Sequence, residues 1–284
     1  MKISDSLELI TLAAVWGASF LFMRIAAPSL GPVLLIELRV LLAGLTLLML
    51  SIRLNLISEI RQQLVPLFVV GCINSAIPFV LFAITSLYLP AGFSSILNAT
   101  APLFGTLIAG FWLREKLTLS QFSGLIVGFA GVTTLVGWTK IPVTLSFILA
   151  VAAGLVASAL YAIAAPYAKQ KLAGVSPIAV ATGSQLSAAI VLFPITPWFL
   201  PSAFPSWTVI LVTIALGLFS TAWAYVMYFR LISNIGASKS LIVAYLIPLF
   251  AMLWGALILG EPITKSMIVG CSLILTGTAI AVSQ

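Results

Sequence analysis

The residues of hydrolytic, metal and disulfide chemistry are nearly missing from this 284-residue chain. It has no histidine, its single aspartate is Asp5, and its two cysteines, Cys72 and Cys271, stand apart inside apolar stretches. A hydrolase or protease needs a positioned base and nucleophile, and a metal or disulfide framework needs grouped ligands. We therefore expect no enzyme activity, no cofactor and no metal site.

Charge is also scarce: 7% of the residues are charged, whereas 62% are hydrophobic and the mean hydropathy is +1.25. Apolar runs of membrane-spanning length follow one another with short breaks. Because lipid offers no hydrogen bonds, backbone groups must pair within helices, so we expect an all-α membrane protein in a lipid bilayer. The net charge of +7 does not indicate nucleic acid, since the basic residues lie in the breaks, where they set topology.

What the chain does contain is an internal repeat. Residues 90–131 match residues 236–277 at roughly 13 of about 42 positions, at a constant offset of 146. The matched pairs include a proline, a glutamate and two glycines: Pro102, Glu115, Gly124 and Gly131, repeated as Pro248, Glu261, Gly270 and Gly277. The sequence therefore predicts two domains, residues 1–137 and 138–284, each one copy of a five-helix unit.

Reading the apolar runs against turn signals predicts ten transmembrane helices. They cover 7–27, 32–51, 64–87, 91–113, 120–137, 146–166, 177–199, 208–232, 237–259 and 265–282. Five helices per repeat is an odd number, so the second repeat must enter the membrane inverted, an arrangement typical of transporters with alternating access. With a cytoplasmic N-terminus, about nine basic residues fall inside and three outside, which favours cytoplasmic termini.

Several motifs carry a family resemblance. They are Trp16-Gly17-Ala18-Ser19-Phe20, followed by Arg24 and Arg39, and the paired proline, glutamate and glycine positions of the repeat. In this combination the chain resembles the drug/metabolite transporter superfamily in its EamA-type branch, over essentially its whole length. The resemblance implies a carrier of the bacterial inner membrane that exports amino acids and other small metabolites through a central cavity. One departure is Arg114, where the commoner residue before the glutamate is glycine.

Candidate binding residues are polar and aromatic groups near mid-span. Each half has a polar pair followed by two aromatics: Asn74, Ser75, Phe79 and Phe82, then Ser220, Thr221, Tyr225 and Tyr228. On the helices that the resemblance places around the cavity, the predicted substrate-binding residues are Ser19, Asn74, Phe79, Phe82, Asn98, Ser158, Tyr161, Tyr225 and Tyr245. The alternative is packing, because small hydroxyl residues commonly join membrane helices and aromatics often fill space or anchor at interfaces.

Prolines and ionisable groups inside spans suggest further roles. Pro78, Pro102 and Pro248 each remove a backbone hydrogen bond and are candidate gating or hinge positions. Pro78 has no counterpart in the second repeat, so we expect the third helix to bend differently from the eighth. Glu37 and Arg39 are candidates for ion coupling, although both lie within two turns of a helix start and could reach the interface.

The repeated glutamates and glycines have structural interpretations. Glu115 and Glu261 lie at helix ends, where we expect each to cap the helix that follows. The repeated glycines recur at seven-residue spacing and should allow close helix approach.

The sequence thus favours a facilitator for neutral or zwitterionic amino acids, since no deep carboxylate is present in the first span. An aromatic lining would favour aromatic amino acids, because rings stack and bury area without a charge partner.

The alternative transporter is a proton-coupled multidrug or nucleotide-type metabolite exporter. A structural or signalling membrane protein would need an exposed domain or long polar tail, which the sequence does not show. A monomer is expected, because two repeats in one chain complete the site.

Overall fold

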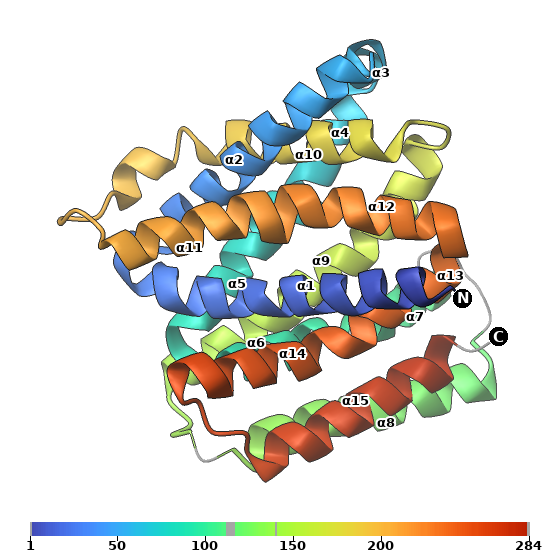
Figure 1. The fold of residues 1–284 in the computed structure, drawn as a ribbon. Coiled ribbons are helices and arrows are strands. Elements are labelled where there is room, and N and C mark those ends of the chain that lie inside the picture. Colours follow the sequence, from blue (N-terminus) through green and yellow to red (C-terminus); the bar gives the residue numbers. More distant parts are fainter. Residues whose placement is uncertain (1, 112–116, 140, 283–284) are drawn as a thin grey trace.

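The computed structural model describes residues 2–111, 117–139 and 141–282. Within these ranges the chain forms helices joined by short turns, and it contains no strand (Figure 1). The all-α prediction is therefore confirmed for this part of the chain. The basic residues Arg114, Lys116 and Lys140, and the repeated Glu115, lie outside the described residues.

The helices divide between the two halves of the chain. The first half contains α1 (Ile3–Leu30), α2 (Pro32–Arg53), α3 (Ile57–Gln62), α4 (Leu64–Gly71), η1 (Cys72–Ala76), α5 (Ile77–Tyr88), α6 (Ala91–Asn98), α7 (Ala101–Phe111) and α8 (Leu119–Gly137). The second half contains α9 (Leu145–Lys171), α10 (Pro177–Leu192), η2 (Thr196–Phe199), α11 (Trp207–Gly217), η3 (Leu218–Trp223), α12 (Ala224–Ile235), α13 (Ala237–Ser240), α14 (Ile242–Leu259) and α15 (Lys265–Val282).

In the described ranges, nine helical segments are long and apolar enough to cross a bilayer. The segment expected at 177–199 is shorter: α10 has 16 residues and ends at Leu192, and the 3-10 turn η2 follows after a break. Pro194 and Pro197 explain the early end, because each lacks a backbone donor and disfavours helical geometry in the residue before it. Ten membrane crossings therefore remain a prediction.

Two long segments each contain a π-helical insertion in the middle. η1 joins α4 to α5 and η3 joins α11 to α12, and the two start at positions separated by the repeat offset. Pro78 is the second residue after η1, whereas Ala224 stands at the matching position of the second half, directly after η3. The π turn η3 therefore forms without a following proline. Such turns widen a helix locally and are frequent at functional sites.

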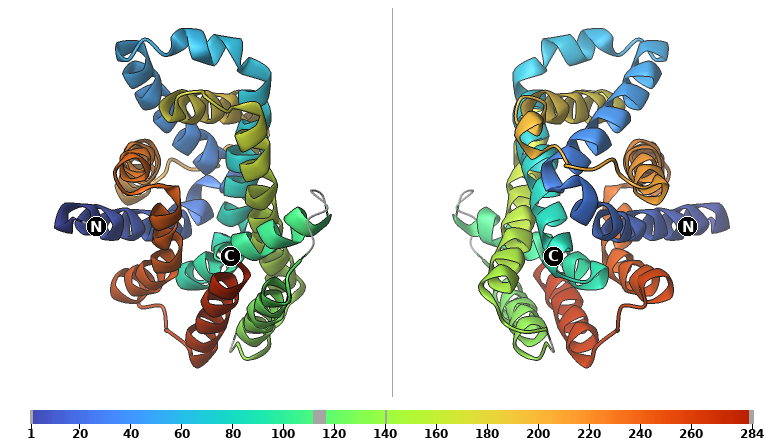
Figure 2. Two further views of the ribbon diagram at one scale, coloured as in Figure 1. Left: turned by 90° about the vertical axis from the view of Figure 1, so that its right-hand side faces the viewer. Right: turned by 90° about the vertical axis from the view of Figure 1, so that its left-hand side faces the viewer.

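Helices α8 and α15 lie side by side along one edge of the bundle (Figures 1 and 2). A Cβ added at Gly124 would lie 2.6 Å from the carbonyl oxygen of Gly277, and one at Gly131 would lie 2.8 Å from that of Gly270. Close helix approach at the repeated glycines is therefore confirmed. The contact is reciprocal between equivalent positions, as an approximate twofold axis between the halves would produce.

The remaining helices fill the bundle between this pair and the opposite edge. There α2 packs on α10, and α4 packs on α10 as well. Between the two edges, α1 packs on α14 and α5 packs on α9, so each central contact joins the two halves of the chain. Both ends of the described chain lie at the same end of the bundle, which we call the terminal end (Figure 1).

Candidate functional site

A cavity of about 750 Å³ lies among the central helices. Its wall is mostly apolar and aromatic, with a few amide and hydroxyl groups and one charged side chain among the described residues, which is the usual make-up of a small-molecule site. The wall reaches the terminal end of the bundle, where it includes Leu241 and Val282, 48% and 46% exposed. Toward the opposite end it includes Met23, which is 2% exposed.

Eight of the nine predicted binding residues line this cavity: Ser19, Asn74, Phe79, Phe82, Asn98, Tyr161, Tyr225 and Tyr245. Ser158 does not. Its fully buried hydroxyl donates to the carbonyl oxygens of Leu97 at 2.9 Å and Gly154 at 3.0 Å. These contacts favour the packing alternative for Ser158, because its hydroxyl joins α9 to α6 and is fully buried outside the cavity wall.

The three proline candidates have different positions. Pro102 lines the cavity, whereas Pro78 and Pro248 are buried outside its wall. The expected single helix at 91–113 is broken at Ala99 and Thr100, so Pro102 lies in the first turn of α7, where a missing N–H costs little. The matching Pro248 lies inside the continuous helix α14.

The helix break at Ala99 and Thr100 also places Asn98 at the end of α6, in the cavity wall. No hydrogen bond joins the Asn98 amide to the rest of the described chain. Asn74 also lines the wall, and its side chain lies near the hydroxyl of Tyr225. The wall therefore offers two amide side chains, Asn74 and Asn98, to a solute.

Arg39 contributes to the cavity wall and is 5% exposed. Its Nε atom donates to the Thr221 hydroxyl at 2.9 Å, and Nη1 lies 3.8 Å from the Met23 sulfur. The guanidinium carbon lies 3.7 Å from the centre of the Phe79 ring, a cation–π contact. In the described ranges no carboxylate pairs with Arg39, and no other charged side chain lines the cavity.

Glu37, the other coupling candidate, is absent from the cavity wall. It is 3% exposed, and its Oε2 atom has no hydrogen-bond partner in the described chain. Residues two apart on a helix do not face each other, so Glu37 and Arg39 are presented to different surroundings.

Aromatic rings form much of the wall. Phe82 packs between Phe20 and Tyr161. Its ring centroid lies 5.6 Å from that of Phe20, edge-on, and 6.0 Å from that of Tyr161, with the two rings nearly parallel. The ring centroids of Trp16 and Tyr228 are 5.1 Å apart. Trp16 and Phe20 are not among the binding residues predicted from the sequence. Their spacing of four residues, which places both rings on one face of the helix, could have identified them.

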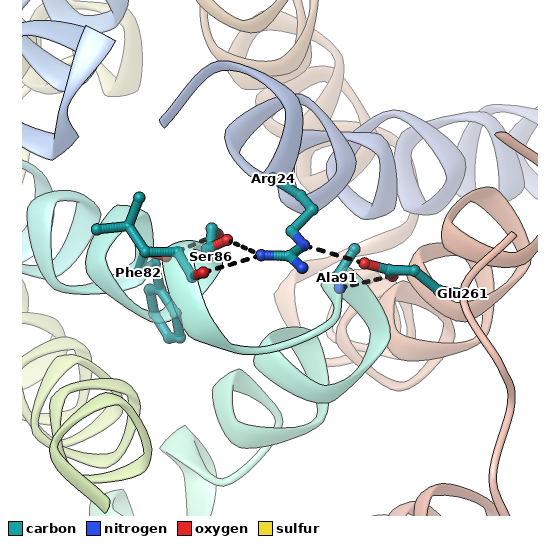
Figure 3. Close-up of polar contacts among 6 residues, drawn as sticks. Arg24, Phe82, Ser86, Ala91 and Glu261 are labelled. Atoms are coloured by element: carbon teal, nitrogen blue, oxygen red, sulfur yellow. Dashed lines mark hydrogen bonds and ion pairs between the residues drawn. The ribbon is translucent and has the colours of Figure 1, made fainter. Parts of the chain in front are cut away.

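At the end of the bundle opposite the termini, a network around Arg24 and Glu261 joins the two halves of the chain (Figure 3). The Arg24 Nε donates to Glu261 Oε1 at 3.2 Å, and its Nη1 donates to the carbonyl oxygens of Ser86 at 2.7 Å and Leu87 at 3.1 Å. The other carboxylate oxygen accepts the Ala91 backbone N–H at 2.9 Å. We call this set of contacts the Arg24–Glu261 clamp.

The clamp corrects one expectation. Glu261 does cap a helix, but the helix is α6 of the first half and not α15, which follows it in sequence. The Thr264 hydroxyl accepts from the Met267 backbone N–H and caps α15 instead. A second ion pair, between Arg230 and Glu8 with Nε to Oε1 at 2.9 Å, joins α12 to α1 nearer the terminal end.

Comparison with known proteins gives one family. The family model described as the EamA-like transporter family matches residues 6–137 and again residues 148–283. An "Uncharacterized transporter" of Archaeoglobus fulgidus is 26% identical over 270 residues, 95% of each chain. The "Uncharacterized transporter YoaV" of Bacillus subtilis is 26% identical, with 95% of this chain and 94% of that protein covered.

A third relative has a more specific name. The "Probable terminal-alkyne amino-acid exporter" of Streptantibioticus cattleyicolor is 25% identical, with 99% of this chain and 94% of that protein covered. A solved crystal structure superposes with a TM-score of 0.68 at 18% identity, covering 99% of this chain and 97% of the other. That superposition supports the fold and carries no information on substrate.

Proposed function

The chain belongs to the EamA-like transporter family, and on this premise we propose that it exports small amphipathic metabolites, with neutral and above all aromatic amino acids as the preferred class. The observation that carries this proposal is the cavity of about 750 Å³, whose wall combines aromatic rings with amide and hydroxyl groups. Rings can stack on an apolar side chain, while a few polar groups orient the solute. The amino-acid exporter among the relatives supports the same substrate class.

We propose that transport occurs by alternating access between two inverted five-helix repeats, residues 1–137 and 138–284. Three observations support this arrangement. The family model matches the chain twice, the π insertions η1 and η3 start at the repeat offset, and equivalent glycines of α8 and α15 contact each other reciprocally. Two similar halves can exchange conformations and so open the cavity to either face.

In the proposed orientation the protein lies in a bacterial inner membrane with both termini in the cytoplasm, and it acts as a monomer. The distribution of basic residues supports this orientation. The cavity reaches the terminal end, so this conformation would face the cytoplasm, with the Arg24–Glu261 clamp closing the outer side. Export would then require the clamp to open.

A proton-coupled exporter of cationic drugs is the second candidate. That activity would call for a carboxylate in the wall, and in the described residues the wall has none. The unpaired Glu37 carboxylate, buried nearby on α2, is the single feature that favours this alternative. The wall therefore supports the facilitator more strongly.

Counterflow in proteoliposomes tests the two candidates together. Labelled phenylalanine, labelled threonine and a cationic dye are each measured with and without an imposed pH gradient. The facilitator predicts amino-acid exchange that ignores the gradient and falls in the cavity variants Tyr161→Ala and Asn98→Ala. Asn234→Ala, an exposed amide on α12 outside the wall, is the matched control. Gradient-driven dye movement without amino-acid flux would reject the proposal in favour of the alternative.

A further inference from the structure

We propose that Arg39 binds the carboxylate of the transported solute, so that the substrate class is monocarboxylates with an apolar tail, including neutral amino acids. This inference deepens the proposed function and rests on it. It arises from a charge in the cavity wall that the protein itself does not neutralise.

Two other arginines of the described chain have carboxylate partners, whereas the buried Glu37, which lies outside the cavity wall, has none. Arg24 pairs with Glu261, and Glu8 pairs with Arg230. Arg39 is more deeply buried than Arg24 or Arg230, yet its contacts are a hydroxyl, a thioether and an aromatic ring, all uncharged. A charge in a membrane interior is costly unless it is paired or hydrated, and such residues commonly mark substrate pathways. An anionic ligand in the cavity would supply the missing partner.

The guanidinium is held in place while part of it remains available. Thr221 of η3, Met23 of α1 and Phe79 of α5 contact it from three different elements. Of its five N–H donors, these contacts engage the Nε–H and one on Nη1, and none involves Nη2. A fixed fork with free donors is suited to a planar carboxylate, which it can bind through two parallel hydrogen bonds.

The rest of the wall selects among anions and against cations. Because the wall has no second basic residue in the described ranges, a phosphate monoester, with about −1.5 to −2 charge, would remain partly uncompensated. The ammonium group of an amine without a carboxylate would be repelled by the Arg39 charge, because no acidic side chain in the described part of the wall could pair with it. An α-ammonium group beside a bound carboxylate can be accommodated by the cavity's aromatic faces and amide oxygens.

Ligand-dependent thermal stability of the purified protein in detergent tests this directly. The probes are phenylalanine, 3-phenylpropionate, phenethylamine and phenyl phosphate. For the wild type we expect the two carboxylates to raise the unfolding midpoint and the amine to leave it unchanged. We expect phenyl phosphate to bind at least several-fold more weakly. This comparison needs no variant, so it stays decisive even if changes at Arg39 impair folding.

Variants then assign the effect to one side chain. In Arg39→Gln, carboxylate affinity should fall about tenfold or more, because a charge-assisted bidentate contact is lost. Arg39→Lys should retain part of it, since an ammonium keeps the charge without the planar fork. Arg53→Gln, an exposed arginine at the end of the same helix, is the matched control and should bind normally.

The outcomes separate this inference from the proposed function. Carboxylate binding that depends on Arg39, with no amino-acid flux in proteoliposomes, supports the binding role and rejects amino-acid transport. Amino-acid flux that is inhibited equally by phenethylamine and 3-phenylpropionate, or that persists in folded Arg39→Gln with unchanged affinity, overturns the inference and leaves the function intact. Failure of any carboxylate to stabilise or inhibit the folded wild type also overturns it.

Discussion

The two ends of the cavity are held in different ways. At the end opposite the termini, the Arg24–Glu261 clamp joins α1, the end of α5, the start of α6 and the segment before α15 (Figure 3). At the terminal end, Arg230 and Glu8 join α12 to α1, and the Arg230 side chain is 70% exposed. Both networks join the two halves, but Arg24 and Glu261 are both partly shielded, whereas the second pair combines a buried Glu8 with a largely exposed Arg230.

This difference indicates which end resists opening. Charge-assisted bonds to backbone groups are stronger than exposed ion pairs, which contribute about 0–1 kcal/mol. At the terminal end, residues of α7, α8, α14 and α15 contribute to the cavity wall, and no ion pair joins the described parts of these helices. A carrier that alternates must weaken the clamp and build contacts at the terminal end.

The largest expected effect comes from the close contact between α8 and α15, which is independent of both ion pairs. Gly277→Leu would drive a side chain into the backbone of α8 near Gly124, with overpacking that we expect to cost about 3 kcal/mol or more. The measurement is the unfolding midpoint in detergent together with the yield of monodisperse protein. Gly137→Leu, where an added Cβ meets nothing, is the control on the same pair of helices.

Normal stability of Gly277→Leu would mean that α8 and α15 do not hold the bundle together at this contact. It would also remove the reciprocal packing from the support for two similar halves.

The next effect should appear when the clamp is broken. Glu261→Gln removes the carboxylate charge that binds both Arg24 and the Ala91 N–H. We expect the arrangement with the clamp formed to lose about 1–3 kcal/mol of stabilisation. In a background without Cys72 and Cys271, a Ser19→Cys probe in the cavity wall should react several-fold faster with an impermeant maleimide added from the outer side.

Glu59→Gln is the matched control for this labelling experiment. The Glu59 carboxylate also accepts a backbone N–H, from Ser176 at 2.8 Å, yet neither residue lines the cavity. Equal labelling rates in Glu261→Gln and the unaltered probe protein would show that the clamp does not close that end.

A smaller effect is expected at Pro78, the proline without a counterpart after η3. If the first-half segment hinges there, Pro78→Ala restores a backbone donor at α5 and should slow exchange a few-fold while leaving binding affinity unchanged. The reciprocal Ala224→Pro tests whether the second half tolerates the same hinge. A Pro78→Ala carrier with full exchange rate counts against the hinge.

The smallest effect is expected at the terminal end. Glu8→Gln weakens an ion pair whose arginine is largely exposed, so we expect a stability change of no more than about 1 kcal/mol. Labelling of the Ser19→Cys probe from the outer side should not change. A destabilisation as large as that of Glu261→Gln would erase the contrast between the two ends.

Much of the site could be predicted because periodicity and repetition are local signals. The polar pair and two aromatics of each half, near η1 and η3, were found from their spacing at the repeat offset, and Asn74, Phe79, Phe82 and Tyr225 all line the cavity. Ser158 does not line the cavity, because its position depends on how α9 rotates against α6, which no local pattern encodes.

The sequence alone determined that this chain is a helical membrane protein with repeated segments, because composition and hydropathy leave the backbone few other ways to satisfy its hydrogen bonds in lipid. The end of α10 at Leu192 was not predicted, although the two prolines that follow it were visible in the sequence. Only the tertiary structure decided which partners meet. Glu261 caps α6 instead of α15, Arg24 pairs with Glu261 across the two halves, and Arg39 lies in the cavity wall without a counter-charge among the described residues. These contacts join residues far apart in the chain, so their geometry exists only after the helices have packed.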